Sequence, residues 1–193
     1  MPNGKLKVVN LLGSPGQGKS TVRSGVFWLM KTYGMSVEEV SEYAKYLVLS
    51  GRTWQLSTDQ MYVFAKQHHK QLVLKGQYEY AVTDSPLVLC DFYAPKPYFD
   101  SFTGLVREAF DAFENVNFFL SRDLDAAPFE GEGRMHDKEM SKRVEHEMRE
   151  YLAKRNIPYI DLPIDITTPW RIMEQLKPGL ASLPTFGDLA PKG

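Results

Sequence analysis

Hydrophobic residues along this chain follow two patterns: short runs that are almost wholly apolar, and longer segments in which apolar positions recur every three or four residues. Residues 5–12 follow the first pattern after Lys7, as a strand buried on both faces of a parallel sheet does. Residues 19–33 follow the second pattern, with apolar side chains at Val22, Val26, Leu29 and Met30. Because Gly34 then provides a C-terminal stop, this spacing predicts a helix.

The same two patterns recur as far as residue 177. We expect further strands over residues 36–41, 80–83, 117–121 and 157–162. We expect helices over residues 42–49, 53–75, 102–113, 138–155 and 169–177, with Ser57 or Thr58 as a cap or kink and Pro169 at the last helix start. Strands that alternate with helices predict an α/β fold, one domain over residues 1–193 with a doubly wound, mainly parallel five-stranded sheet.

Two segments interrupt the periodicity. Residues 122–137 contain two glycines, a proline and mixed charges, which is typical of a mobile lid inserted before the following helix. Residues 183–193 are rich in turn-forming residues, and we expect them to form a loosely held tail.

A glycine-rich loop separates the first strand from the first helix. Its residues are Gly13, Ser14, Pro15, Gly16, Gln17, Gly18, Lys19 and Ser20, followed by Thr21. Glycines let successive backbone N–H groups turn toward one anion, and the helix adds the positive end of its dipole. Lys19 would reach the β- and γ-phosphates, and the Ser20 hydroxyl would ligate Mg²⁺. The loop therefore predicts binding of ATP and Mg²⁺, in preference to an ordinary glycine-rich turn.

Carboxylates follow two of the predicted strands at the edge where such sheets bind ligands. Asp84 is our candidate for a Mg²⁺ ligand or catalytic group, with an Asx turn as the alternative. Glu42 is our candidate for the base that takes a proton from the acceptor, with capping of the next helix as the alternative.

Arginines in and around the predicted lid could contact a triphosphate. Arg122 follows the fourth strand, Arg134 lies within the lid, and Arg143 lies in the next helix. Bidentate guanidinium contacts stabilise charge on a transferred phosphoryl group, so we predict that Arg122 binds ATP and that Arg134 takes part in catalysis. A solvated surface arginine is the alternative for each.

Composition narrows the class of protein without identifying a partner. The chain has 193 residues, is 43% hydrophobic and has a net charge of −1, which indicates no bulk attraction to nucleic acid or membrane but leaves room for a local basic groove. The single cysteine, Cys90, is expected in the core, and His68 and His69 are expected as surface or core residues instead of metal ligands. With no signal peptide or membrane-length apolar run, we expect a cytoplasmic protein.

With its glycine-rich loop and the polar residues that follow its strands, the chain resembles the thymidylate-kinase-like branch of P-loop kinases over about residues 7–162. Three further runs are similar to a bacteriophage group that includes the 5-hydroxymethyluracil DNA kinases: Ser-Glu-Tyr-Ala-Lys from Ser41, Val-Thr-Asp-Ser-Pro-Leu from Val82 and Asn-Phe-Phe-Leu from Asn117. The resemblance implies transfer of the γ-phosphate of ATP to the hydroxymethyl group of 5-hydroxymethyldeoxyuridine in phage DNA, a step in thymidine hypermodification.

Alternative acceptors stay open at this stage. Many nucleoside monophosphate kinases place an Asp-Arg or Glu-Arg pair after a strand, whereas here Tyr43 follows Glu42 and Ser85 follows Asp84, which favours a neutral hydroxyl. A kinase of a free nucleoside or nucleotide would share the other motifs, and a hydrolytic or switch NTPase would share the loop. A DNA acceptor would require local cations, for which the candidates are Lys96, Arg52, Lys66 and Lys70.

Overall fold

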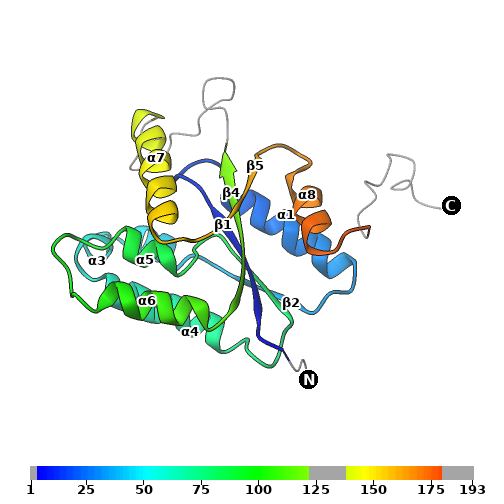
Figure 1. Cartoon of the computed structure of the whole chain (residues 1–193), viewed down its shortest axis with the longest axis horizontal. Helices are drawn as coiled ribbons and strands as arrows, with labels where there is room; N and C mark the ends of the chain where they lie inside the picture. The colour runs from blue at the N-terminus through cyan, green and yellow to red at the C-terminus, as the bar shows by residue number, and fades with distance from the viewer. Residues whose placement is uncertain (1–3, 122–137, 180–193) are drawn as a thin grey trace.

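A parallel sheet organises the computed structural model, which describes residues 4–121 and 138–179 (Figure 1). Its strands are β1 (Lys7–Leu12), β2 (Val37–Val40), β3 (Tyr80–Thr83), β4 (Glu114–Ser121) and β5 (Ile160–Pro163). They lie in the order β2-β3-β1-β4-β5, and every neighbouring pair is parallel. The predicted α/β fold and five-stranded sheet are confirmed.

Helices cover both faces of this sheet (Figure 1). They are α1 (Lys19–Thr32), α2 (Tyr43–Leu49), α3 (Trp54–Thr58), α4 (Gln60–Leu72), α5 (Val88–Phe92), α6 (Phe102–Asp111), α7 (Lys138–Lys154) and α8 (Thr168–Leu176). Neighbouring β1 residues point to opposite faces: Val8 packs in a cluster with side chains of α4 to α7, and Val9 packs in a cluster with α1 and α8. Because β1 is buried on both faces, its sequence is nearly all apolar.

The first helix agrees closely with the sequence pattern. All four apolar residues that define its predicted stripe are buried: Val22, Val26, Leu29 and Met30. The helix ends where Gly34 adopts a φ of 69°, a left-handed conformation that glycine accepts without a Cβ penalty.

The prediction of one helix over residues 53–75 is wrong, because the segment forms α3 and α4 with a break at Asp59. Asp59 caps α4, since its side chain accepts a hydrogen bond from the Tyr62 backbone N–H at 3.1 Å. The break is therefore not at Ser57 or Thr58, whose hydroxyls donate instead to the Trp54 carbonyl within α3. The break reflects a short polar side chain that bonds a backbone group in place of the continuing helix.

Strand β4 begins earlier than its apolar run suggests, at Glu114 instead of Asn117. Its first half contains Asn115 and Asn117, whose side-chain oxygens accept hydrogen bonds from Asn10 Nδ2 of β1 at 2.8 and 2.9 Å. These amide contacts satisfy polar groups inside the sheet, so a strand continues where the hydrophobic pattern stops. Helix α5 was not predicted, since its single buried turn has no periodicity to detect.

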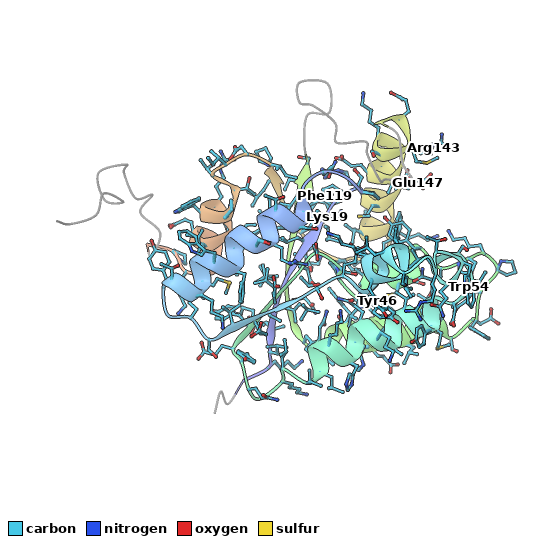
Figure 2. All side chains as sticks on the ribbon, turned by 180° about the vertical axis from the view of Figure 1, so that it is seen from behind. Lys19, Tyr46, Trp54, Phe119, Arg143 and Glu147 are labelled. Carbon is cyan, nitrogen blue, oxygen red and sulfur yellow. The ribbon has the colours of Figure 1, made fainter. Side chains whose placement is uncertain are left out.

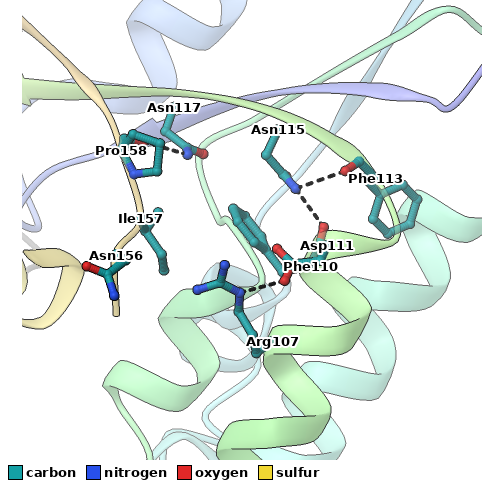
Figure 3. A pocket seen from close by; sticks show the side chains of 9 residues that line it. All are labelled: Arg107, Phe110, Asp111, Phe113, Asn115, Asn117, Asn156, Ile157 and Pro158. Atoms are coloured by element: carbon teal, nitrogen blue, oxygen red, sulfur yellow. Dashed lines mark hydrogen bonds and ion pairs between the residues drawn. The ribbon is translucent and has the colours of Figure 1, made fainter. Parts of the chain in front are cut away.

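A cavity of about 200 Å³ lies beside Asn115 and Asn117 of β4, near the ends of α6 and α7 (Figure 3). Several of its polar groups form hydrogen bonds within the protein. Asn117 Nδ2 donates to the Pro158 carbonyl at 2.9 Å, and Arg107 Nε donates to Asp111 at 2.6 Å. The cavity lies toward the amino ends of the strands, away from the glycine-rich loop.

The predicted lid over residues 122–137 and the predicted tail over residues 183–193 lie outside the described residues. Among the helices that the structure describes, none has both the length and the apolar composition needed to cross a membrane.

Candidate active site

The glycine-rich loop joins the carboxyl end of β1 to the first turn of α1. Gly18 immediately precedes α1 with a φ of 100°, and Gly13 leaves β1 with a φ of 139°, so both adopt backbone conformations that other residues rarely take. A Cβ atom at Gly13 would also lie 2.5 Å from the Leu120 carbonyl oxygen and 2.7 Å from Gln17 Oε1. The loop shape therefore depends on glycine at these two positions.

Side chains of the loop stabilise its turn from inside. Lys19 Nζ donates hydrogen bonds to the carbonyl oxygens of Gly13 and Ser14, each at 2.8 Å. Gln17 is fully buried, and its Oε1 accepts the Ser14 N–H at 3.1 Å. The loop thus wraps around the Lys19 ammonium at the N-terminus of α1.

Asp84, which follows β3, lies against α1 and is 3% exposed. The Ser20 hydroxyl donates to Asp84 Oδ2 at 2.6 Å, and Arg23 Nη1 donates to Asp84 Oδ1 at 2.8 Å. The side-chain hydrogen bond of the turn after β3 comes instead from Thr83, whose Oγ1 accepts the Ser85 N–H at 3.1 Å. The carboxylate of Asp84 is therefore directed at the glycine-rich loop and the first turns of α1, and it does not form the Asx turn that was the alternative.

Ser20 and Asp84 together form a donor set that suits Mg²⁺. The ion prefers hard oxygen ligands, and it binds nucleotides through one or two protein groups together with phosphate oxygens and water. A hydroxyl and a carboxylate oxygen 2.6 Å apart at the start of α1 match that requirement. Over residues 4–121 and 138–179, no three His, Cys, Asp or Glu side chains gather into a larger metal site.

Glu42 follows β2 and occupies the N-cap position of α2, but its side chain makes no capping hydrogen bond. Burial raises the pKa of this carboxyl, the positive charge of Lys19 opposes the rise, and the negative charge of Asp84 adds to it. These influences place Glu42 within electrostatic reach of both Lys19 and Asp84. A carboxylate with a raised pKa is a stronger base than an ordinary glutamate.

Two cations lie near Asp84: Arg23, which the sequence did not indicate, and Lys70, which was expected only as a candidate contact to DNA. Arg23 joins Asp84 to Glu39 of β2, where its Nε lies 3.3 Å from a carboxylate oxygen. Burial lowers the pKa of Lys70 on α4, and the charges of Arg23 and Asp84 affect it in opposite directions. Arg23 could have been found from spacing, since it lies four residues after Lys19 on the same helix face. The place of Lys70 near Asp84 could not have been found in this way, because α4 reaches the site only through tertiary packing.

Helix α7 also contacts the glycine-rich loop. Gln17 Nε2 donates to Glu145 at 2.7 Å, and the Ser141 hydroxyl donates to the Pro15 carbonyl at 3.3 Å. Arg149 supports this end of α7, since its guanidinium lies 3.9 Å from the centre of the Phe119 ring and donates to Asp161 at 2.7 Å. The segment that follows the predicted lid is thus attached to the loop.

The remaining candidates lie elsewhere. Arg122 and Arg134 lie outside the described residues and stay predictions, and Arg143 lies exposed on α7 (Figure 2). Burial raises the pKa of the Cys90 thiol to about 12, so this core residue is a poor nucleophile. His68 stacks on Phe64 with ring centres 5.7 Å apart, which gives it a packing contact.

The strand order β2-β3-β1-β4-β5 and the glycine-rich loop after β1 belong to a fold that is shared with solved structures. A solved structure with this fold is the thymidylate kinase from Ehrlichia chaffeensis, which matches with a TM-score of 0.54 and 15% sequence identity. The match covers 90% of this chain and 100% of that one. No family model and no curated protein matches the sequence. The likeness therefore establishes the fold, and the chemistry must be argued from the site.

We expect Gly13→Ala to destabilise the protein by about 1–3 kcal/mol, because the residue has a positive φ and its Cβ would meet the Leu120 carbonyl. Thermal unfolding measures the effect. Gly104→Ala is the matched control, since Gly104 lies in α6 with open space around its Cα, and alanine favours a helix. Equal melting temperatures for the two variants would contradict this description of the loop.

Proposed function

We propose that this protein is an ATP-dependent kinase that transfers the γ-phosphate to a hydroxyl group of a nucleoside-type acceptor. The observation that carries the proposal is the hydrogen bond from Ser20 to Asp84 at the head of the phosphate loop. It joins a phosphate-binding loop to a carboxylate from a neighbouring strand, and Glu42 lies within electrostatic reach of both. Loop, metal ligands and candidate base are the parts that phosphoryl transfer requires.

In the proposed reaction, the acceptor oxygen forms a bond to the γ-phosphorus while the bond from that phosphorus to the β,γ-bridging oxygen breaks. Glu42 accepts the proton of the acceptor hydroxyl, and ADP leaves with the bond electrons. Lys19 and the loop N–H groups bind the phosphates and stabilise charge as it develops. Mg²⁺ bound by Ser20 and Asp84 would neutralise charge on the phosphate oxygens.

We further propose that the acceptor is the 5-hydroxymethyl group of 5-hydroxymethyldeoxyuridine in phage DNA. This proposal is supported by the resemblance of the runs that begin at Ser41, Val82 and Asn117. It is also supported by Tyr43 and Ser85, which stand where many monophosphate kinases have an arginine.

A nucleoside monophosphate is the second candidate acceptor. Arg23 and Lys70 provide positive charge beside Asp84, although neither directly follows Glu42 or Asp84 in the sequence. These cations could bind an acceptor phosphate. The structural neighbour from Ehrlichia chaffeensis, a thymidylate kinase, fits the same alternative.

Lys19→Ala tests the kinase proposal. We expect it to lower phosphoryl transfer by at least about 100-fold, since it removes a charge from the transition state. The variant should still fold, with a melting temperature lowered only by the loss of the two hydrogen bonds from Lys19 to the loop. The assay follows label from γ-labelled ATP into four separate acceptors: DNA with 5-hydroxymethyluracil, ordinary DNA, free nucleosides and thymidine monophosphate.

The labelled product decides the acceptor. Label in modified DNA alone supports the DNA assignment, and label in thymidine monophosphate or a nucleoside overturns it in favour of the small-molecule alternative. Turnover of Lys19→Ala near that of the wild type would reject the kinase proposal. Release of phosphate with no labelled acceptor would indicate a hydrolytic NTPase.

The pH dependence of turnover tests Glu42. Since its carboxyl has a raised pKa and acts as a base only when ionised, turnover should fall as the pH decreases through a value above the usual 4.5 of glutamate. Glu42→Gln should lower turnover by about 10²–10⁴-fold and remove this acid limb. Glu38→Gln, in β2, is the control and should retain both rate and limb. An unchanged limb in Glu42→Gln would assign the proton to another group.

A further inference from the structure

Charged residues are distributed unevenly along the chain, although its net charge is close to zero. Residues 43–75, which include α2, α3 and α4, contain five Lys or Arg residues and one acidic residue, Asp59, whereas the whole chain has a net charge of −1. The carboxylate of Asp59 caps α4. This helical segment is therefore a basic region on a slightly acidic protein, which favours an anionic partner.

Two of these cations lie over aromatic rings. The Arg52 guanidinium lies 5.2 Å from the centre of the Tyr46 ring, and Lys66 Nζ lies 5.4 Å from that of Tyr62. Tyr46 is 53% exposed and Trp54 is 60% exposed, large fractions for rings of this size. We call Tyr46, Arg52, Trp54 and Lys66 the aromatic-basic surface.

This surface is continuous with the proposed acceptor site. Tyr43 follows Glu42 directly, and its ring stacks on that of Tyr46 with centres 5.7 Å apart. Lys70 Nζ lies 5.7 Å from the centre of the Tyr43 ring, and the pKa of Lys70 responds to the charge of Asp84. In the view of Figure 2, Tyr46 lies between Lys19 and Trp54.

We propose that the aromatic-basic surface binds single-stranded DNA next to the nucleotide that is phosphorylated. The inference rests on the proposed function for the identity of that nucleotide. Exposed rings stack on unpaired bases, and interleaved cations contact the backbone phosphates, which is the common chemistry of single-strand binding. An acceptor base in DNA must leave its stack to bring its hydroxyl to Glu42, and its neighbours are then best held unpaired.

A second copy of this chain is the competing occupant, because Leu49 and Trp54 expose apolar surface in the same region. Cations that lie over exposed rings favour a polyanion over an identical basic surface, since two like-charged surfaces repel each other. Sedimentation of the wild type and of Trp54→Ala over a range of concentrations separates the two occupants.

The direct test is binding of a fluorescent oligothymidylate of about 15 nucleotides, followed by anisotropy without ATP. Trp54→Ala should weaken binding about tenfold or more, whereas Trp28→Ala should bind as the wild type does. Trp28 is a matched control because it is 55% exposed but lies on α1, in the opposite helical layer (Figure 1).

Salt dependence tests the phosphate contacts separately. In a plot of log binding constant against log salt concentration, Lys66→Gln should reduce the slope by about 0.7, the contribution of one phosphate on a single strand. Lys154→Gln, an exposed residue at the end of α7, should leave the slope unchanged. A duplex of the same length should bind more weakly than the single strand, because its bases are already stacked.

Oligonucleotide binding by Lys19→Ala separates this inference from the kinase proposal, since the Lys19 variant should retain it even without turnover. Equal binding by Trp54→Ala and wild type, or no preference for the single strand over the duplex, would overturn the inference. A dimer that dissociates in Trp54→Ala, with no oligonucleotide bound by the wild type, would assign the surface to a second copy instead.

Discussion

The contact on which the site depends is the pair of hydrogen bonds that Asp84 accepts from Ser20 and Arg23. These bonds fix the start of α1 against the carboxyl end of β3, although Ser20 and Asp84 lie 64 positions apart in the sequence. The charge of a carboxylate that is 3% exposed is compensated there by a guanidinium, whose Nε also lies 3.3 Å from Glu39. The two ion pairs of Arg23, with Asp84 and with Glu39, thus align β2 and β3 with the start of α1.

A second set of contacts attaches the loop to the other half of the sheet. Gln17 reaches Glu145 on α7, and Arg149 on the same helix is bound to Asp161 of β5 and lies over the Phe119 ring of β4. The loop therefore lies between two anchored elements, with Asp84 on one side and α7 on the other. Preorganisation of this kind lets fixed dipoles stabilise transferred charge without rearrangement during the reaction.

The fold could be predicted from the sequence wherever one physical signal acted alone. Buried parallel strands are apolar on both faces, so β1 and β3 were found, and the amphipathic stripe of α1 was correct at every residue. Predictions failed where a polar contact replaced the hydrophobic pattern, as with the asparagines that extend β4 and the Asp59 cap that divides residues 53–75.

The site divides in the same way. The loop is local, so its residues could be named from spacing, and strand exits indicated Glu42 and Asp84 because parallel strands converge at one edge. Lys70 and the chain of rings beyond it depend on how α2 and α4 pack, which no short pattern contains. Arg23 is intermediate, since helical periodicity aligns it with Lys19 but does not name its partner.

The central claim is that Asp84 holds the metal and the start of α1 for phosphoryl transfer, and steady-state kinetics of Asp84→Asn test it most directly. Turnover should fall by about 10²–10³-fold, while the dissociation constant for ATP changes much less, because the charge of the carboxylate matters most in the transition state. The melting temperature is measured alongside, since Arg23 would lose its charged partner. Wild-type turnover in a variant with a lowered melting temperature would contradict the account and leave Asp84 as a purely structural residue.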